Sequence, residues 1–102
     1  MNKNDRMIVE SPIYQGEDER IPYPIDTTPW GGSPSNPVIT IKDSTGADVT
    51  AAHTLGVATV NGDKVITPLI INLTKGATYR LEVMFDTGGK TLEAFAILKG
   101  RE

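Results

Sequence analysis

The segment from residue 73 to residue 85 constrains the fold of this chain more than any other. Tyr, Leu, Val and Phe occupy the odd positions from 79 to 85, and Arg, Glu and Met occupy the even positions between them. Successive side chains of a strand point to opposite faces, so this alternation predicts a strand with one face in a core.

Turn residues divide the rest of the chain into short apolar runs. Seven prolines and ten glycines interrupt the sequence, and no window has the apolar period of a helix over three turns. Short runs at this spacing predict an all-β fold in one domain that spans residues 1–102. We expect strands at 6–10, 20–26, 37–43, 56–60, 64–73, 78–86 and 90–99, with a short edge strand at 47–50.

Two prolines lie in the expected strand 20–26. Pro22 and Pro24 remove two N–H donors from the same side of the strand, which leaves the other side able to pair. This pattern predicts an edge strand or a strand that changes its partner. An extended loop is the alternative.

A chain reversal is expected before the strand 78–86. Gly76 can supply a backbone turn between Leu73 and Tyr79. A tyrosine that begins the next strand can bury its ring, while its hydroxyl bonds to backbone near the corner.

The spacing Leu73-x-x-Gly76-x-x-Tyr79 resembles the join between the fifth and sixth strands of fibronectin type III and other immunoglobulin-like domains. The resemblance implies an immunoglobulin-like (fibronectin III-like) antiparallel β-sandwich of about seven strands. The chain departs from these families because it has no cysteine pair and because Trp30 lies in the Pro/Gly-rich loop 27–37. The three corner residues concern the fold, which hosts many unrelated functions.

Composition excludes several functions. The net charge is −3 with no basic run, so we expect no nucleic-acid partner. Without cysteine, there are no disulfides or thiolate sites. No apolar run approaches the ~20 residues of a membrane helix, and residues 1–10 lack the apolar core of a secretory signal. We therefore expect a complete, small, soluble protein made in the cytoplasm, without a membrane partner.

The sequence shows no pattern that predicts catalysis. His53 is the only histidine and is expected to be a surface loop residue. The carboxylates of 17–19, and Asp43 with Asp48, could bind calcium, but no EF-hand loop is present and solvated turns are the favoured interpretation. We expect no catalytic residue, no cofactor and no metal ion.

One feature does indicate a partner surface. If alternate residues of 90–99 face inward from Leu92 on, Phe95 and Ile97 face outward beside Met84. The strand 64–73 is expected to add outward apolar residues at Ile66, Pro68 and Ile70. The alternative is a β-bulge in 92–98 that turns Phe95 and Ile97 inward. A partner surface would consist of Met84, Phe95 and Ile97, with Trp30 in its loop.

The succession of strands and turns across the whole chain resembles that of small β-sandwich proteins encoded in bacteriophage or prophage structural gene clusters. The resemblance implies a non-enzymatic virion accessory protein for capsid decoration, neck or tail. Such a protein would contact virion proteins or itself, in the virion or in the host cytoplasm. The alternative function is a carbohydrate- or other ligand-binding module that uses Trp30, Tyr14 and Tyr23.

Overall fold

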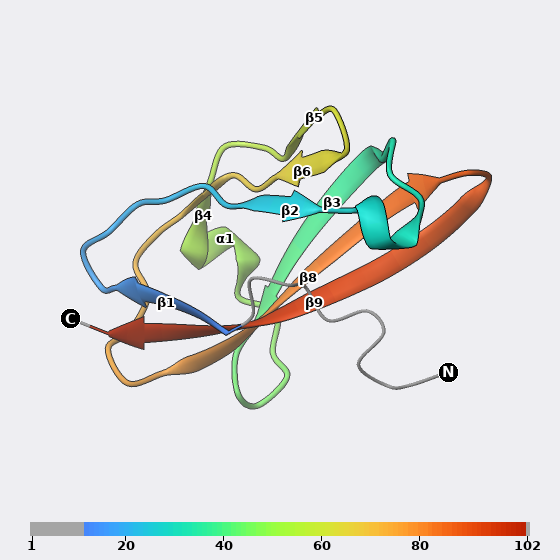
Figure 1. Cartoon of the computed structure of the whole chain (residues 1–102). Helices are drawn as coiled ribbons and strands as arrows, with labels where there is room; N and C mark the ends of the chain where they lie inside the picture. Colours follow the sequence, from blue (N-terminus) through green and yellow to red (C-terminus); the bar gives the residue numbers. More distant parts are fainter. Residues whose placement is uncertain (1–11, 102) are drawn as a thin grey trace.

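A computed structural model of the chain describes residues 12–101 (Figure 1). Strands dominate the described residues, which confirms the prediction of an all-β chain. In chain order the elements are β1 (Ile13–Gly16), β2 (Pro24–Asp26), the 3₁₀ turn η1 (Thr28–Trp30), β3 (Ser35–Lys42), α1 (Thr50–His53), β4 (Thr54–Leu55), β5 (Thr59–Asn61), β6 (Lys64–Ile66), β7 (Leu69–Ile70), β8 (Thr78–Thr87) and β9 (Lys90–Arg101).

A four-stranded sheet with the order β1-β9-β8-β3 forms the larger layer. Its centre is the hairpin of β8 and β9, which pairs without interruption from Thr78 opposite Lys99 to Thr87 opposite Lys90. β3 runs antiparallel to β8, and β1 runs parallel to β9. A three-stranded sheet, β2-β6-β5, and the short pair β4-β7 lie across the inner face of this layer (Figure 1).

One apolar core lies between these sheets. The odd positions from Tyr79 to Phe85 are buried, as the alternation predicts, and Ala94, Ala96 and Leu98 are buried opposite them on β9. Side chains of the smaller sheets complete the cluster, among them Ile25, Val65 and Ile70.

The chain breaks its ladder between Ile66 and Leu69, where a single strand over 64–73 is predicted. Pro68 has no N–H to donate to a ladder, and the chain leaves β2 and β5 there to pair with β4. The break shifts the side-chain pattern. Ile70 is fully buried and Pro68 is buried too, so the prediction that they face outward is wrong.

Residues 47–50 make only an isolated antiparallel bridge, from Asp48 to Lys42 of β3, where a short edge strand is predicted. They wrap onto the open edge of β3, where the Val49 N–H donates to the Ile41 carbonyl over 2.8 Å. The Ile41 N–H donates to the Thr50 hydroxyl over 2.9 Å, and Thr50 begins the single turn α1. The segment thereby covers backbone groups that an edge strand would leave unpaired.

The segment with two prolines does change partner. Ile21 bridges to Ile70 on β7, and residues 24–26 then pair with β6 at the edge of the three-stranded sheet. The strand itself is limited to Pro24–Asp26. β1 has no counterpart among the predicted strands, and the predicted strand 6–10 lies outside the described residues.

Candidate functional site

The outward face of the four-stranded sheet carries several apolar side chains. Met84 on β8 lies directly opposite Val38 on β3, and the two are 39% and 48% exposed. On β9, Phe95 and Ile97 are half-buried on the same face. Tyr14 on β1 extends the row at the far edge and is 49% exposed. We call these five residues the outer-face row.

The uninterrupted hairpin decides between two predictions for this face. Glu82 pairs with Phe95 and Arg80 with Ile97, and no register shift occurs between β8 and β9. The bulge proposed as an alternative for 92–98 is therefore wrong, and Phe95 and Ile97 point away from the core. The register shift of this sheet lies in β3, between Ser35 and Val38.

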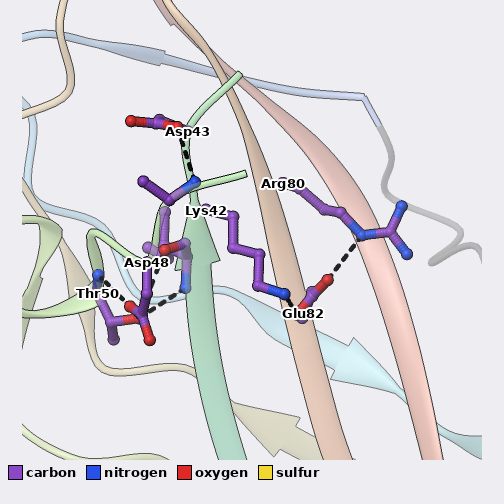
Figure 2. Close-up of polar contacts among 8 residues, drawn as sticks. Lys42, Asp43, Asp48, Thr50, Arg80 and Glu82 are labelled. Atoms are coloured by element: carbon purple, nitrogen blue, oxygen red, sulfur yellow. Dashed lines mark hydrogen bonds and ion pairs between the residues drawn. The ribbon is translucent and has the colours of Figure 1, made fainter. Parts of the chain in front are cut away.

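Charged side chains flank the outer-face row. Glu82 lies between two cations (Figure 2): its carboxylate is 3.5 Å from the Lys42 Nζ and accepts a hydrogen bond from the Arg80 Nε over 2.9 Å. The Arg80 guanidinium carbon is also 4.1 Å from the centroid of the Phe95 ring, a cation–π contact. The face therefore combines apolar area with both signs of charge.

Trp30 lies apart from this face. Its ring centroid is 6.1 Å from that of Phe85, an inward-facing core residue, so it packs on the core side at the turn of the β8–β9 hairpin. The structure thus places Met84, Phe95 and Ile97 on one face and Trp30 elsewhere. Trp30 lines a separate surface hollow of about 310 Å³ with Gly31, Gly32, Ser33, Thr87, Gly88 and Lys90.

The three aromatic residues predicted as a sugar platform do not converge. Trp30 packs beside Phe85, opposite Leu92 on β9, whereas Tyr14 pairs with Lys99 near the other end of β9. The seven-residue step along β9 from Leu92 to Lys99 spans about 23 Å, so Trp30 and Tyr14 lie near opposite ends of the sheet. Tyr14 and its neighbour Gln15 point to opposite faces of β1, and Tyr23 contacts Gln15.

Tyr23 belongs to a polar cluster in the interior. Its hydroxyl donates to the Gln15 Oε1 over 2.6 Å, while the Gln15 amide donates to the carbonyls of Glu19 and Ile70. Gln15 is fully buried, and these three bonds satisfy its side chain. Burial, followed by the charge of Glu19, raises the pKa of Tyr23 to about 12.

The corner residues lie at the opposite end from Trp30. Gly76 has φ +83°, a left-handed conformation that favours glycine. Tyr79 is buried, and its hydroxyl accepts a hydrogen bond from the Thr74 N–H over 2.9 Å. Leu73 is buried beside it in the core.

His53 is not a surface loop residue, which corrects the prediction. It ends α1, its ring lies edge-on to Tyr79 with centroids 4.8 Å apart, and its Nδ1 is 3.2 Å from the Ile71 carbonyl oxygen. These contacts give the ring a packing role against the corner.

Asp43 and Asp48, two of the carboxylates considered for calcium, stabilise turns. Asp43 accepts hydrogen bonds from the N–H and hydroxyl of Thr45, and Asp48 accepts the same pair from Thr50. These bonds stabilise the charged form and lower the pKa of both carboxyls. Within residues 12–101, no three His, Cys, Asp or Glu side chains gather as a metal site.

A second apolar area was missed by the sequence analysis. Leu55 in β4, Val57 in the connection and Val60 in β5 are 52%, 79% and 41% exposed. The predicted strand 56–60 holds valines at positions 57 and 60, which cannot share one face of a strand. This spacing was the signal in the sequence that both valines could not lie on the buried face of the predicted strand.

The chain matches no known protein-family model, and no curated protein is recognisably similar to it. Within the part of the chain that the structure covers, no helix has the length and apolar character to span a membrane.

Proposed function

We propose that this protein is a non-enzymatic structural protein that acts through protein–protein contacts on its outer-face row. The observation that carries the proposal is the uninterrupted β8–β9 register, which holds Met84, Phe95 and Ile97 on one outward face. A sheet face in water normally alternates to polar residues, and a cluster of apolar side chains there indicates a partner surface.

The chemistry of this face suits a protein partner. Aromatic residues, methionine and arginine are enriched at the centres of protein interfaces. The face presents Tyr14, Met84 and Phe95, with Arg80 stacked on Phe95 and the Arg101 guanidinium carbon 5.5 Å from the Tyr14 ring centroid. Both signs of charge nearby can select a complementary partner.

We also propose that the fold is an immunoglobulin-like sandwich. Constant-type immunoglobulin domains place strands A, B, E and D in one sheet and C, F and G in the other. The order β2-β6-β5 corresponds to B-E-D, and β3-β8-β9 corresponds to C-F-G. β1 then takes the place of A, paired with the last strand instead of with B.

The biological setting that we propose is a bacteriophage or prophage virion, where the protein would serve as a capsid decoration, neck or tail accessory. The pattern of strands and turns supports this setting. The protein would lie in the virion, and in the host cytoplasm before assembly. The proposal assigns it no catalytic residue, cofactor or metal ion.

The test is incorporation into particles of the virus or prophage that encodes the chain. We expect the wild-type protein to be found in purified particles and the double variant Met84→Asp/Phe95→Asp to be absent, because two carboxylates would be desolvated at the interface. Val57→Asp is the matched control, since Val57 is exposed outside the row.

Circular dichroism of each variant is the check that it folds. Equal incorporation of the double variant and the wild type would remove the outer-face row from the proposal. Sedimentation velocity distinguishes self-association from binding to another virion protein. Self-association through this face predicts an oligomer that the double variant loses.

A second candidate function is ligand binding at Trp30. The observation in its favour is the partly buried indole at the wall of a hollow that is also lined by hydroxyl and backbone groups. Tyr14 and Tyr23 take no part in it.

A further inference from the structure

The loop that carries Trp30 lies between the β5–β6 turn and the β8–β9 hairpin (Figure 1) and bonds to both. The Thr87 hydroxyl of the hairpin donates to the Gly32 carbonyl over 2.5 Å. Asp63 of the β5–β6 turn accepts the Ser33 N–H at Oδ1 over 2.9 Å and the Thr27 N–H at its carbonyl, also over 2.9 Å. These bonds fix the loop that carries Trp30 against both other turns.

The hollow between this loop and the hairpin turn is thus bounded by anchored walls. Its volume of about 310 Å³ is at the lower end of the range for small-molecule sites. The indole of Trp30 is held by its contact with Phe85. A wall that is already ordered loses little conformational entropy when a ligand binds.

The lining has one charged side chain, Lys90. Among the described residues, no carboxylate forms an ion pair with it. The other lining residues are Trp30, Ser33, Thr87 and three glycines. The lining therefore combines an aromatic residue, residues with hydrogen-bonding groups and a lysine within one small site.

We propose that this hollow binds a saccharide that carries a carboxylate, an inference that rests on the ligand-binding role and is independent of the outer-face row. A sugar ring lays its C–H face on an aromatic side chain and turns its hydroxyls to polar groups. Its carboxylate accepts a charge-assisted hydrogen bond from the Lys90 ammonium. A neutral sugar offers that ammonium no charged partner.

Trp30 is the only tryptophan, so its fluorescence reports on this site alone. The probes are tri-galacturonate and, as the neutral counterpart, a galactotriose with the same linkage. We expect a saturable spectral change with the acidic probe and about tenfold weaker binding of the neutral one. Added salt weakens binding of the acidic probe only.

Two lysines on the same strand give the matched variants. Lys90→Gln is expected to lower affinity for the acidic probe to the level of the neutral one. Lys99→Gln, near the other end of β9, is expected to leave it unchanged. Backbone amide shifts of Gly31, Gly32 and Gly88 in NMR titrations test binding without relying on fluorescence.

The possible outcomes test the acidic specificity and the ligand-binding role separately. Equal affinity for both probes, unaffected by Lys90→Gln, overturns the acidic specificity while the ligand-binding role stands. If neither probe produces a spectral change or amide shifts, both the acidic specificity and the ligand-binding role are overturned.

Discussion

Single threonines and aspartates account for much of the turn geometry of this protein. Asp26, Asp43 and Asp48 each accept hydrogen bonds from the N–H and the hydroxyl of the threonine two residues later. The same local arrangement recurs because a short carboxylate can replace a backbone acceptor in a turn. These acidic residues are thus explained by the fold.

At this scale Tyr79 gives the clearest prediction. In Tyr79→Phe the ring remains buried, but the Thr74 N–H loses its acceptor. We expect the free energy of unfolding to fall by about 1 kcal/mol, the usual cost of a lost hydrogen bond of this kind. Urea denaturation measures it from the transition midpoint and slope.

Tyr14→Phe serves as the control, because Tyr14 is half-exposed on the outer face and is expected to change stability by less than about 0.5 kcal/mol. An unchanged midpoint for Tyr79→Phe would show that the hydroxyl contact does not stabilise the corner.

Among the elements, β8 and β9 are the two longest strands. The corner that leads into β8 is hydrogen-bonded to the end of β9. The Gly76 N–H donates to the Gly100 carbonyl, and the Gly100 N–H donates to the Ala77 carbonyl. A Cβ on Gly100 would lie 2.2 Å from the Thr74 carbonyl oxygen, whereas one on Gly76 would meet nothing within 4 Å. Gly76 is required for its backbone conformation and Gly100 for close approach.

These two roles predict different costs for alanine. We expect Gly76→Ala to lower the free energy of unfolding by about 1–2 kcal/mol, the cost of a left-handed alanine. Gly100→Ala should cost about 3 kcal/mol, because backbone must move to admit the methyl group.

The comparison uses urea midpoints of the two variants measured side by side. If Gly100→Ala were the more stable of the two, the close approach of β9 to the corner would not be a constraint.

For the whole molecule, the cluster of Gln15 and Tyr23 ties the two layers together. Gln15 belongs to the four-stranded sheet, and its side chain bonds to Tyr23 and to Ile70 on β7. The cluster closes the end of the core over the parallel pair β1–β9, where a polar side chain replaces the apolar residue expected at an inward position.

This cluster predicts a loss of stability in alkali. The pKa of Tyr23 is raised to about 12 in the folded protein and is near 10 in an unfolded chain. The folded state holds the proton more tightly, so the contribution is complete below about pH 10 and is lost as the pH rises toward 12.

The measurement is urea denaturation of the wild type and Tyr23→Phe between pH 9 and 12. The wild type is expected to lose more stability than the variant over this interval, since only the wild type titrates at this position. Parallel curves for the two proteins would mean that burial does not shift this phenol.

The hairpin of β8 and β9 could be predicted from sequence because its pattern is local. Alternation over ten or more residues needs no knowledge of the partner strand, so Leu81, Val83 and Phe85 are buried as expected, and Phe95 faces outward on one of two stated alternatives. The corner spacing is equally local.

Only part of the candidate site could be predicted from the sequence. Met84, Phe95 and Ile97 share one strand pair, and alternation predicts their common face once the register of the pair is known to be uninterrupted. Trp30 comes from a loop whose path is set by bonds to Asp63 and Thr87, which lie far away in sequence. No local pattern could separate it from the outer-face row.

Local alternation and turn chemistry therefore determined that this chain is made of strands, which residues its longest hairpin buries, and where it turns at Gly76. Tertiary structure alone decided the rest. β1 paired with β9 and turned a buried glutamine inward, the ladder broke at Pro68 so that Ile70 entered the core, and residues 47–50 covered the edge of β3. The physical reason is that each of these outcomes depends on hydrogen-bond partners distant in sequence, and a residue's own neighbours carry no record of them.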